Sequence, residues 1–251
     1  GGEDLFRGSF DDSLVRLGAV KDATGVVVDM GCGVGTSTRR LAVQFPHANR
    51  VVGIDLSPYF VSVGRKLLEL SPKSYKEGGK WVTSIQPDDR IEYTIGDAAN
   101  TALPSESVAV VSLMLVIHEL PLNATKKIFA EAHRILAPGG QLWIGEMDFD
   151  SPAYAAQRAN PLLFSLVRAT EPYLDEYADG CEEMRTFLGR LFEKVNIGAA
   201  TGRHFAIVAT KGNGLVDDEG IAGRDLYDYR FNSDGSYAVQ DTHLMTWESK
   251  K

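Results

Sequence analysis

An acidic residue followed by three spaced glycines is the most informative chemical feature of the sequence. The segment reads Asp29-Met30-Gly31-Cys32-Gly33-Val34-Gly35. It follows the apolar run 25–30 directly and precedes a helical pattern over 36–45, which Pro46 ends. Glycines in such a turn let the backbone approach a ligand, and the helix N-terminus favours a carboxylate or phosphate. The segment therefore predicts a ligand-binding loop.

Acidic residues also end the next two predicted strands. The apolar run 50–55 ends in Asp55, and the alternating run 91–95 is followed by Gly96 and Asp97. A carboxylate at the end of the strand after a glycine loop can accept hydrogen bonds from ribose hydroxyls. The glycine loop and Asp55 together indicate a nucleoside ligand, and Asp97 is a third acid placed to contact it.

Strand and helix patterns alternate from residue 25 to residue 146, which predicts a parallel sheet with helices on both faces. The run 108–117 is continuously apolar, as expected of a central strand covered on both sides. We expect a doubly wound, mostly parallel, seven-stranded sheet, whose strands lie at 25–30, 50–55, 91–95, 108–117, 141–146, 195–198 and 205–210.

Four segments lie outside this alternation. Ser9 and Asp11 are candidate caps for a short leading helix within 11–20, and residues 71–89 are expected to form a surface insertion. In the tail, the runs 226–231 and 236–239 flank Asn232-Ser233-Asp234-Gly235, which predicts a β-hairpin. The aromatic, helical stretch near 150–192 is a candidate covering element for a substrate.

Composition limits the classes of partner and compartment. The chain has 251 residues, a formal net charge of −8 and 44% hydrophobic residues. The acidic balance argues against a nucleic-acid partner, and no apolar run reaches the roughly 20 residues of a membrane span. Its two cysteines, Cys32 and Cys181, form neither a disulfide framework nor a metal-ligand spacing. We expect a soluble intracellular protein, either cytoplasmic or organellar, and the sequence does not predict an oligomeric state.

Four segments resemble the motifs of class I S-adenosylmethionine (SAM)-dependent methyltransferases, in family order. They are DMGCGVG, GIDLS, GDA and HRILAPGGQLWI, spread over residues 25–146. The overall pattern is most similar to the small-molecule, type 11-like branch. The resemblance implies a Rossmann-like fold, SAM as cofactor and S-adenosylhomocysteine as its product.

The resemblance also assigns residues to the methionine end of SAM. It implies that Asp29 bonds the amino group, directly or through water, and that Leu113 or Met114 lies beside the sulfonium. The glycines that would border the methionine part are Gly31, Gly33 and Gly35. For Leu113 and Met114 a purely structural role in the core is the alternative.

At the adenosine end, the resemblance implies that Asp55 holds the ribose hydroxyls and that Leu56 covers the adenine. Asp97 would accept a hydrogen bond from the adenine amino group, and Ala98 would offer its backbone N–H. Leu56, like the two apolar residues above, has a core role as its alternative.

Catalysis of methyl transfer rests on positioning for an in-line displacement and, where the nucleophile carries a proton, on a base. His118, just after the fourth predicted strand, is the best candidate for a base or a substrate contact. The alternative is a structural histidine with no role in catalysis. Glu146 and Asp148 end the next strand and are candidates for contact with the substrate. The alternative is that both are solvated carboxylates without a functional role. His204 and His243 are weaker candidates.

The sequence lacks several motifs that would indicate particular classes of methyl acceptor. Ser112-Leu113-Met114-Leu115 stands where some family branches carry an Asn/Asp-Pro-Pro-Tyr/Phe motif for amide or adenine nitrogens. Two scattered cysteines argue against arsenite methylation. No metal-ligand cluster is recognisable in the sequence, so we expect no metal. A small-molecule acceptor, apolar or aromatic, is the resulting hypothesis; the methylated atom is not predicted.

Three alternatives stay open. A nicotinamide-dependent oxidoreductase would also use a glycine loop with a downstream acid, but it prefers a Gly-x-Gly-x-x-Gly spacing. The second is a non-catalytic regulatory or interaction module, which would keep the SAM-binding residues but would not transfer the methyl group. A methyltransferase acting on a protein side chain is the third. For the methyltransferase we expect one SAM-binding domain over 1–211, with the substrate-covering insertion near 150–192, and a C-terminal extension over 212–251.

Overall fold

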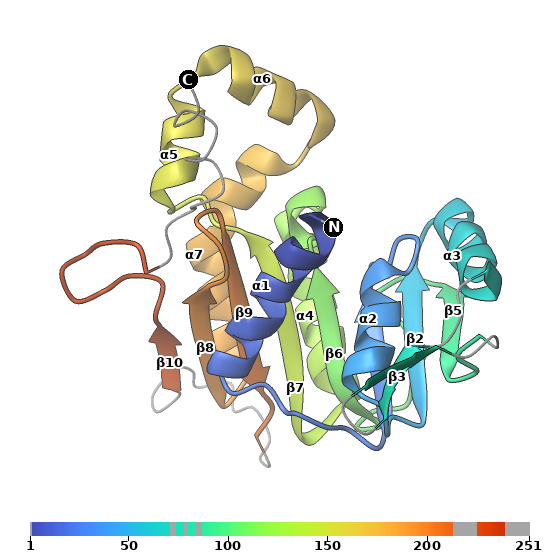
Figure 1. The fold of residues 1–251 in the computed structure, drawn as a ribbon. Coiled ribbons are helices and arrows are strands. Elements are labelled where there is room, and N and C mark those ends of the chain that lie inside the picture. The colour runs from blue at the N-terminus through green and yellow to red at the C-terminus, as the bar shows by residue number, and fades with distance from the viewer. Residues whose placement is uncertain (1, 71–73, 78–79, 84–86, 213–224, 239–251) are drawn as a thin grey trace.

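A mostly parallel sheet of eight strands organises the chain (Figure 1). The computed structural model describes residues 2–70, 74–77, 80–83, 87–212 and 225–238. The strand order is β10-β8-β9-β7-β6-β1-β2-β5, and β9 runs antiparallel to both of its neighbours. The strands are β1 (Val26–Met30), β2 (Arg50–Asp55), β5 (Ile91–Ile95), β6 (Val108–Met114), β7 (Leu136–Met147), β8 (Lys194–Ala199), β9 (His204–Thr210) and β10 (Asp225–Asp228). The doubly wound Rossmann-like fold is confirmed.

Helices cover both faces of this sheet. One core layer packs under α1 (Gly2–Arg16), α2 (Thr36–Gln44) and α3 (Pro58–Leu70), and the other packs under α4 (Leu122–Ile135) and α7 (Leu174–Leu191). In β1, Val27 belongs to the first layer, and Val28 belongs to the second. Successive strand side chains point to opposite faces, so a strand covered on both sides needs a continuous apolar run.

The sheet differs from the prediction by one strand. Seven strands were expected, and the eighth is β10, which pairs in parallel with β8 at the sheet edge. The first strand of the predicted tail hairpin, 226–231, overlaps β10, but it was expected to pair within the tail and not with the main sheet. The predicted hairpin is reduced to one antiparallel bridge between Phe231 and Tyr237 around the 232–235 turn. Val239, which was expected in its second strand, lies outside the described residues.

The leading helix is longer than predicted. It begins at Gly2 and ends at Arg16, so Ser9 and Asp11 lie within α1 and do not cap it. Ser9 bonds the carbonyl of Leu5 inside the helix, and Asp11 accepts from Arg40 on α2. The ion pair and the buried Phe10 hold α1 against its neighbours, and neither contact is visible as local periodicity.

The segment near 150–192 divides into two parts. The first contains α5 (Pro152–Arg158) and α6 (Pro161–Thr170), which stand beyond the carboxyl edge of the sheet (Figure 1). The second is α7, whose Tyr177, Met184 and Leu188 are buried in the core layer shared with α4. Only α5 and α6 have the position expected of a covering insertion.

Within the expected 71–89 insertion, β3 (Ser74–Glu77) and β4 (Lys80–Thr83) pair as a separate antiparallel ribbon. Among the described residues, no helix combines the length and apolar character needed to cross a membrane.

Candidate active site

The glycine loop after β1 has one open position. Gly31, Gly33 and Gly35 all have left-handed backbone, with φ of 71°, 53° and 81°. A Cβ added at Gly31 would lie 2.7 Å from the Val116 side chain, and one at Gly35 would lie 2.0 Å from the Tyr93 hydroxyl. At Gly33 the same atom would meet nothing within 4 Å. Packing therefore requires Gly31 and Gly35, whereas Gly33 leaves space for a ligand.

Asp55 lies directly beside this loop. Its Oδ2 accepts from the backbone N–H of Gly33 at 2.8 Å, and its Oδ1 accepts from that of Ser57 at 2.8 Å. Each carboxylate oxygen has a further lone pair, so the group can still accept from a vicinal diol. The adjacent Leu56 is 73% exposed, which makes it available for an apolar ligand contact and excludes a core role.

Asp97 is brought to the same edge by strand pairing. β5 pairs in parallel with β2, with Ile95 opposite Asp55, and Gly96 donates to the Asp55 carbonyl at 3.0 Å. Asp97 is exposed, and its Oδ1 accepts from the N–H of Ala99 at 2.8 Å. Ala98 is half-buried beside it. The four predicted adenosine contacts thus lie at neighbouring strand ends.

Asp29 lies beneath the loop and is only 1% exposed. Its Oδ2 accepts from Ser37 Oγ and Thr38 Oγ1, both at 2.6 Å, so it anchors the first turn of α2. No hydrogen-bond partner for the buried Oδ1 is found in the part of the chain that the structure describes. Burial raises the pKa of Asp29 to about 6, although its hydroxyl partners oppose the shift.

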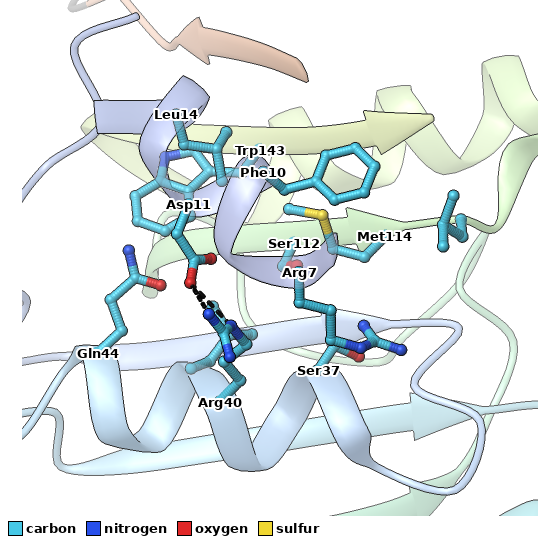
Figure 2. Close-up of a pocket in the computed structure, with 12 residues that line it drawn as sticks. Arg7, Phe10, Asp11, Leu14, Ser37, Arg40, Gln44, Ser112, Met114 and Trp143 are labelled. Carbon is cyan, nitrogen blue, oxygen red and sulfur yellow. Dashed lines mark hydrogen bonds and ion pairs between the residues drawn. The ribbon is translucent and has the colours of Figure 1, made fainter. Parts of the chain in front are cut away.

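A small cavity opens between α1 and α2 near this loop (Figure 2). Arg7, Ser37 and Met114 contribute to its lining, and Figure 2 shows the Arg7 side chain beside Ser37. Arg7 is close enough to Asp29 for its positive charge to lower the pKa of that carboxyl. Sequence reasoning missed Arg7 because the predicted helix began after it.

The structure separates the two residues considered for the end of β6. Leu113 is 1% exposed and belongs to the core layer under α4 and α7. Met114 points to the opposite face and lines the cavity. The side chain available to a ligand is therefore that of Met114, whereas Leu113 has the core role that was its alternative.

His118 and Glu146 form a buried pair. His118 lies in the short helix η1 (Ile117–Glu119), and its Nδ1 is 2.6 Å from Glu146 Oε1. Glu146 is fully buried, so it is not a solvated strand-end carboxylate. Its Oε2 accepts from the N–H groups of Ile117 and His118 at 3.0 and 3.3 Å. Burial opposes the His118 charge, but the hydrogen bond and charge of Glu146 outweigh it, and the pKa of His118 is raised.

Two further carboxylates face the other nitrogen of the His118 ring. Nε2 lies 4.0 Å from Glu119 Oε1 and 3.9 Å from Glu171 Oε2. Burial, followed by the charge of Glu119, raises the pKa of Glu171. Glu171 comes from the segment between α6 and α7, and nothing in its local sequence indicated a site residue.

The remaining candidates lie apart from this cluster. Asp148 is 1% exposed and accepts from Arg230 and Tyr237, so it too is no solvated carboxylate. The ring of His204 packs edge-to-face against Phe6 and Phe10 of α1. His243 lies outside the described residues.

The fold and this site together define a class of protein. Residues 28–144 match the family model described as a methyltransferase domain. With the glycine loop, the strand-end acids and the Rossmann-like sheet, this match makes just under half of the chain similar to the class I SAM-dependent methyltransferases.

Comparisons with individual proteins show the same similarity. A trans-aconitate 2-methyltransferase from Methylobacterium radiotolerans is 28% identical over 68% of this chain and 54% of its own length. One from Azoarcus sp. is 30% identical over 56% of this chain and 46% of its own. The chain thus spans about half the length of these curated relatives.

Solved structures confirm the fold. A SAM-dependent methyltransferase structure from Methanosarcina mazei has a TM-score of 0.54 at 15% identity, covering 79% of this chain and 97% of its own. A structure from Methanococcus maripaludis has a TM-score of 0.54 at 18% identity, covering 86% and 90%.

Proposed function

We propose that this chain transfers a methyl group from SAM to a small-molecule acceptor by in-line displacement. The observation that carries the proposal is the contact between the open glycine, Gly33, and the Asp55 carboxylate at the carboxyl edge of the sheet. Ligands of open α/β folds bind at this edge. The same contact lies within the methyltransferase domain.

The residues at the edge suit the adenosine part of the cofactor. Asp55 accepts from the ribose hydroxyls, and the exposed Leu56 covers the adenine. Asp97 accepts from the adenine amino group, with the Ala98 N–H beside it. These roles are supported by the pairing of β2 with β5, which brings both acids to one edge.

The cavity between α1 and α2 suits the charged methionine part. The Arg7 guanidinium is a donor for the carboxylate, and Met114 provides an apolar wall near the sulfonium. Asp29 acts from below by fixing the start of α2. Its buried Oδ1, which has no hydrogen-bond partner among the described residues, favours a nearby positive group. When bound, SAM supplies a methyl group already activated by its sulfonium.

The acceptor binds beyond β6, between η1 and the helices α5 and α6. His118 is the titratable side chain at the acceptor site, and Glu146 is a positioning residue that orients its ring. The relatives named for trans-aconitate support a small-molecule acceptor. An apolar or aromatic acceptor fits the apolar surface of α6, where Leu162 and Leu166 are exposed.

A calorimetric titration of SAM, S-adenosylhomocysteine and NAD(H) tests the proposal. We expect binding of the two adenosyl ligands and none of NAD(H), followed by transfer of a labelled methyl group to a member of a small-molecule panel. Binding of NAD(H) alone would contradict the cofactor assignment. SAM binding without turnover on any small molecule, peptide or protein acceptor would favour a non-catalytic module.

A further inference from the structure

Three side chains of the metal-ligating kind converge where β6 ends. His118 and Glu119 come from η1, and Glu171 comes from the α6–α7 connection. One ligand atom from each lies within 4.8 Å of the other two. These residues belong to none of the elements that form the glycine loop or the adenosine edge.

The hydrogen bonds of Glu146 determine which nitrogen of His118 faces this cluster as an acceptor. Glu146 Oε1 also accepts from the Met147 N–H at 2.8 Å, and Oε2 accepts from two backbone N–H groups. A carboxylate offers only acceptors, so Nδ1 of His118 must donate to it. In the neutral ring, Nε2 therefore carries a lone pair directed away from Glu146.

The lone pair meets no donor within the described residues. The His118 side chain is 9% exposed, and its Nε2 is 3.9–4.0 Å from two carboxylate oxygens, which is too far for a hydrogen bond. The Glu171 Oε2 atom is itself buried without a hydrogen-bond partner there. With a neutral ring, three electron-rich atoms thus face one another, and a metal ion among them removes the repulsion without protonating Nε2.

The spacing suits a metal ion. In a tetrahedral site, bonds of about 2.0–2.2 Å from a metal to imidazole nitrogen and carboxylate oxygen place the ligand atoms about 3.4 Å apart. The Nε2–oxygen distances of 3.9 and 4.0 Å are longer by about 0.5 Å, so the Glu119 and Glu171 side chains must turn slightly towards the ion. A metal-bound histidine commonly donates its other N–H to a carboxylate, as His118 does to Glu146.

We propose that His118, Glu119 and Glu171 bind one first-row divalent cation, and that Glu146 orients the imidazole for it. One nitrogen and two oxygen ligands suit Mn²⁺, Fe²⁺ or Zn²⁺. The three protein ligands leave positions for water or for an oxygen or nitrogen of an acceptor. This site does not depend on the proposed methyl transfer.

Mn²⁺ binding to the chelator-treated full chain tests the site. We expect the paramagnetic resonance signal of free Mn²⁺ to fall until one ion is bound per chain. Glu119→Gln and Glu171→Gln should each weaken binding by more than about tenfold, and Glu146→Gln by about 10- to 100-fold. Glu69→Gln, on the exposed outer face of α3, is the matched control and should bind normally.

A thermal readout supports the assignment. Bound Mn²⁺ should raise the melting temperature of the chain and of Glu69→Gln, but not of Glu171→Gln, because only the native state holds the three ligands together. Glu119 is half-exposed, so Glu119→Gln gives the same comparison with little risk to folding. SAM titrations in the presence of chelator test the methyltransferase proposal separately.

Two results would overturn the proposal. One is the absence of Mn²⁺ and Zn²⁺ binding at millimolar concentration. The other is equal binding by the chain, Glu119→Gln and Glu171→Gln, which would place any bound metal elsewhere.

Discussion

Arg230 Nη1 lies 2.8 Å from Asp148 Oδ1, a buried ion pair between residues 82 positions apart. Arg230 is 3% exposed and Asp148 is 1% exposed. Tyr237 donates to the other Asp148 oxygen at 2.7 Å. The contacts fasten the described C-terminal segment to the end of β7, two residues beyond Glu146, so this segment supports the edge where the acceptor is proposed to bind.

We expect Arg230→Met to lower the free energy of unfolding by about 3–5 kcal/mol, because it leaves the Asp148 charge buried without its ion pair. Urea denaturation measures the change. Arg168→Met is the control, since Arg168 pairs with Asp175 on an exposed surface and should cost less than about 1 kcal/mol. Equal losses in the two variants would show that the buried pair does not hold the segment.

Asp55→Ala should weaken SAM binding, because it removes two charge-assisted hydrogen bonds, each worth about 1.5–3 kcal/mol. Calorimetric titration measures the change in affinity. The thermal transition of the variant must be checked, since Asp55 also accepts from Gly33 and Ser57. Unchanged affinity in a folded variant would contradict the placement of the ribose.

Two alanine substitutions in the glycine loop should separate binding from folding. Gly33→Ala places a methyl group in open space and forces alanine into the left-handed region, at about 1–2 kcal/mol, but it should abolish most SAM binding. Gly35→Ala meets Tyr93 and should destabilise the fold further. Urea denaturation and SAM titration compare the two variants. A normal affinity of Gly33→Ala for SAM would argue against a ligand at that position.

Asp29 should make the chain less stable as pH rises from about 4 to about 6. Its pKa is raised to about 6 by burial, so between those values the native state holds a proton that the unfolded state has released. The cost at neutral pH reaches about 3 kcal/mol. Asp29→Asn should remove this dependence, so the unfolding free energies of variant and parent should diverge towards pH 7. Parallel pH profiles would show that Asp29 is not the group responsible.

Arg7→Gln should weaken SAM binding by about 1.5–3 kcal/mol, because it removes the charged donor assigned to the methionine carboxylate. Arg16→Gln is the matched control on the same helix, since Arg16 donates instead to the carbonyl of Ala199. Calorimetry compares the two variants. The assignment fails when both variants bind SAM like the parent chain.

The local pattern of the sequence was enough to place the acidic residues at one edge of the sheet. Strand-end positions such as Asp55 and Asp97 follow from hydrophobic runs, because a parallel sheet brings its strand ends to one edge wherever the strands lie in order. The glycine loop is likewise a local feature between one strand and one helix. These parts needed no knowledge of contacts between distant segments.

Only the tertiary structure decided which side chains meet across the fold. Arg7 reaches the cavity because α1 packs beside α2, and Glu171 reaches His118 because α7 packs against η1 and the α4 layer. Arg230 finds Asp148 through the short edge strand β10. Each contact joins residues far apart in the chain, and packing sets such contacts without leaving a periodic trace in the sequence.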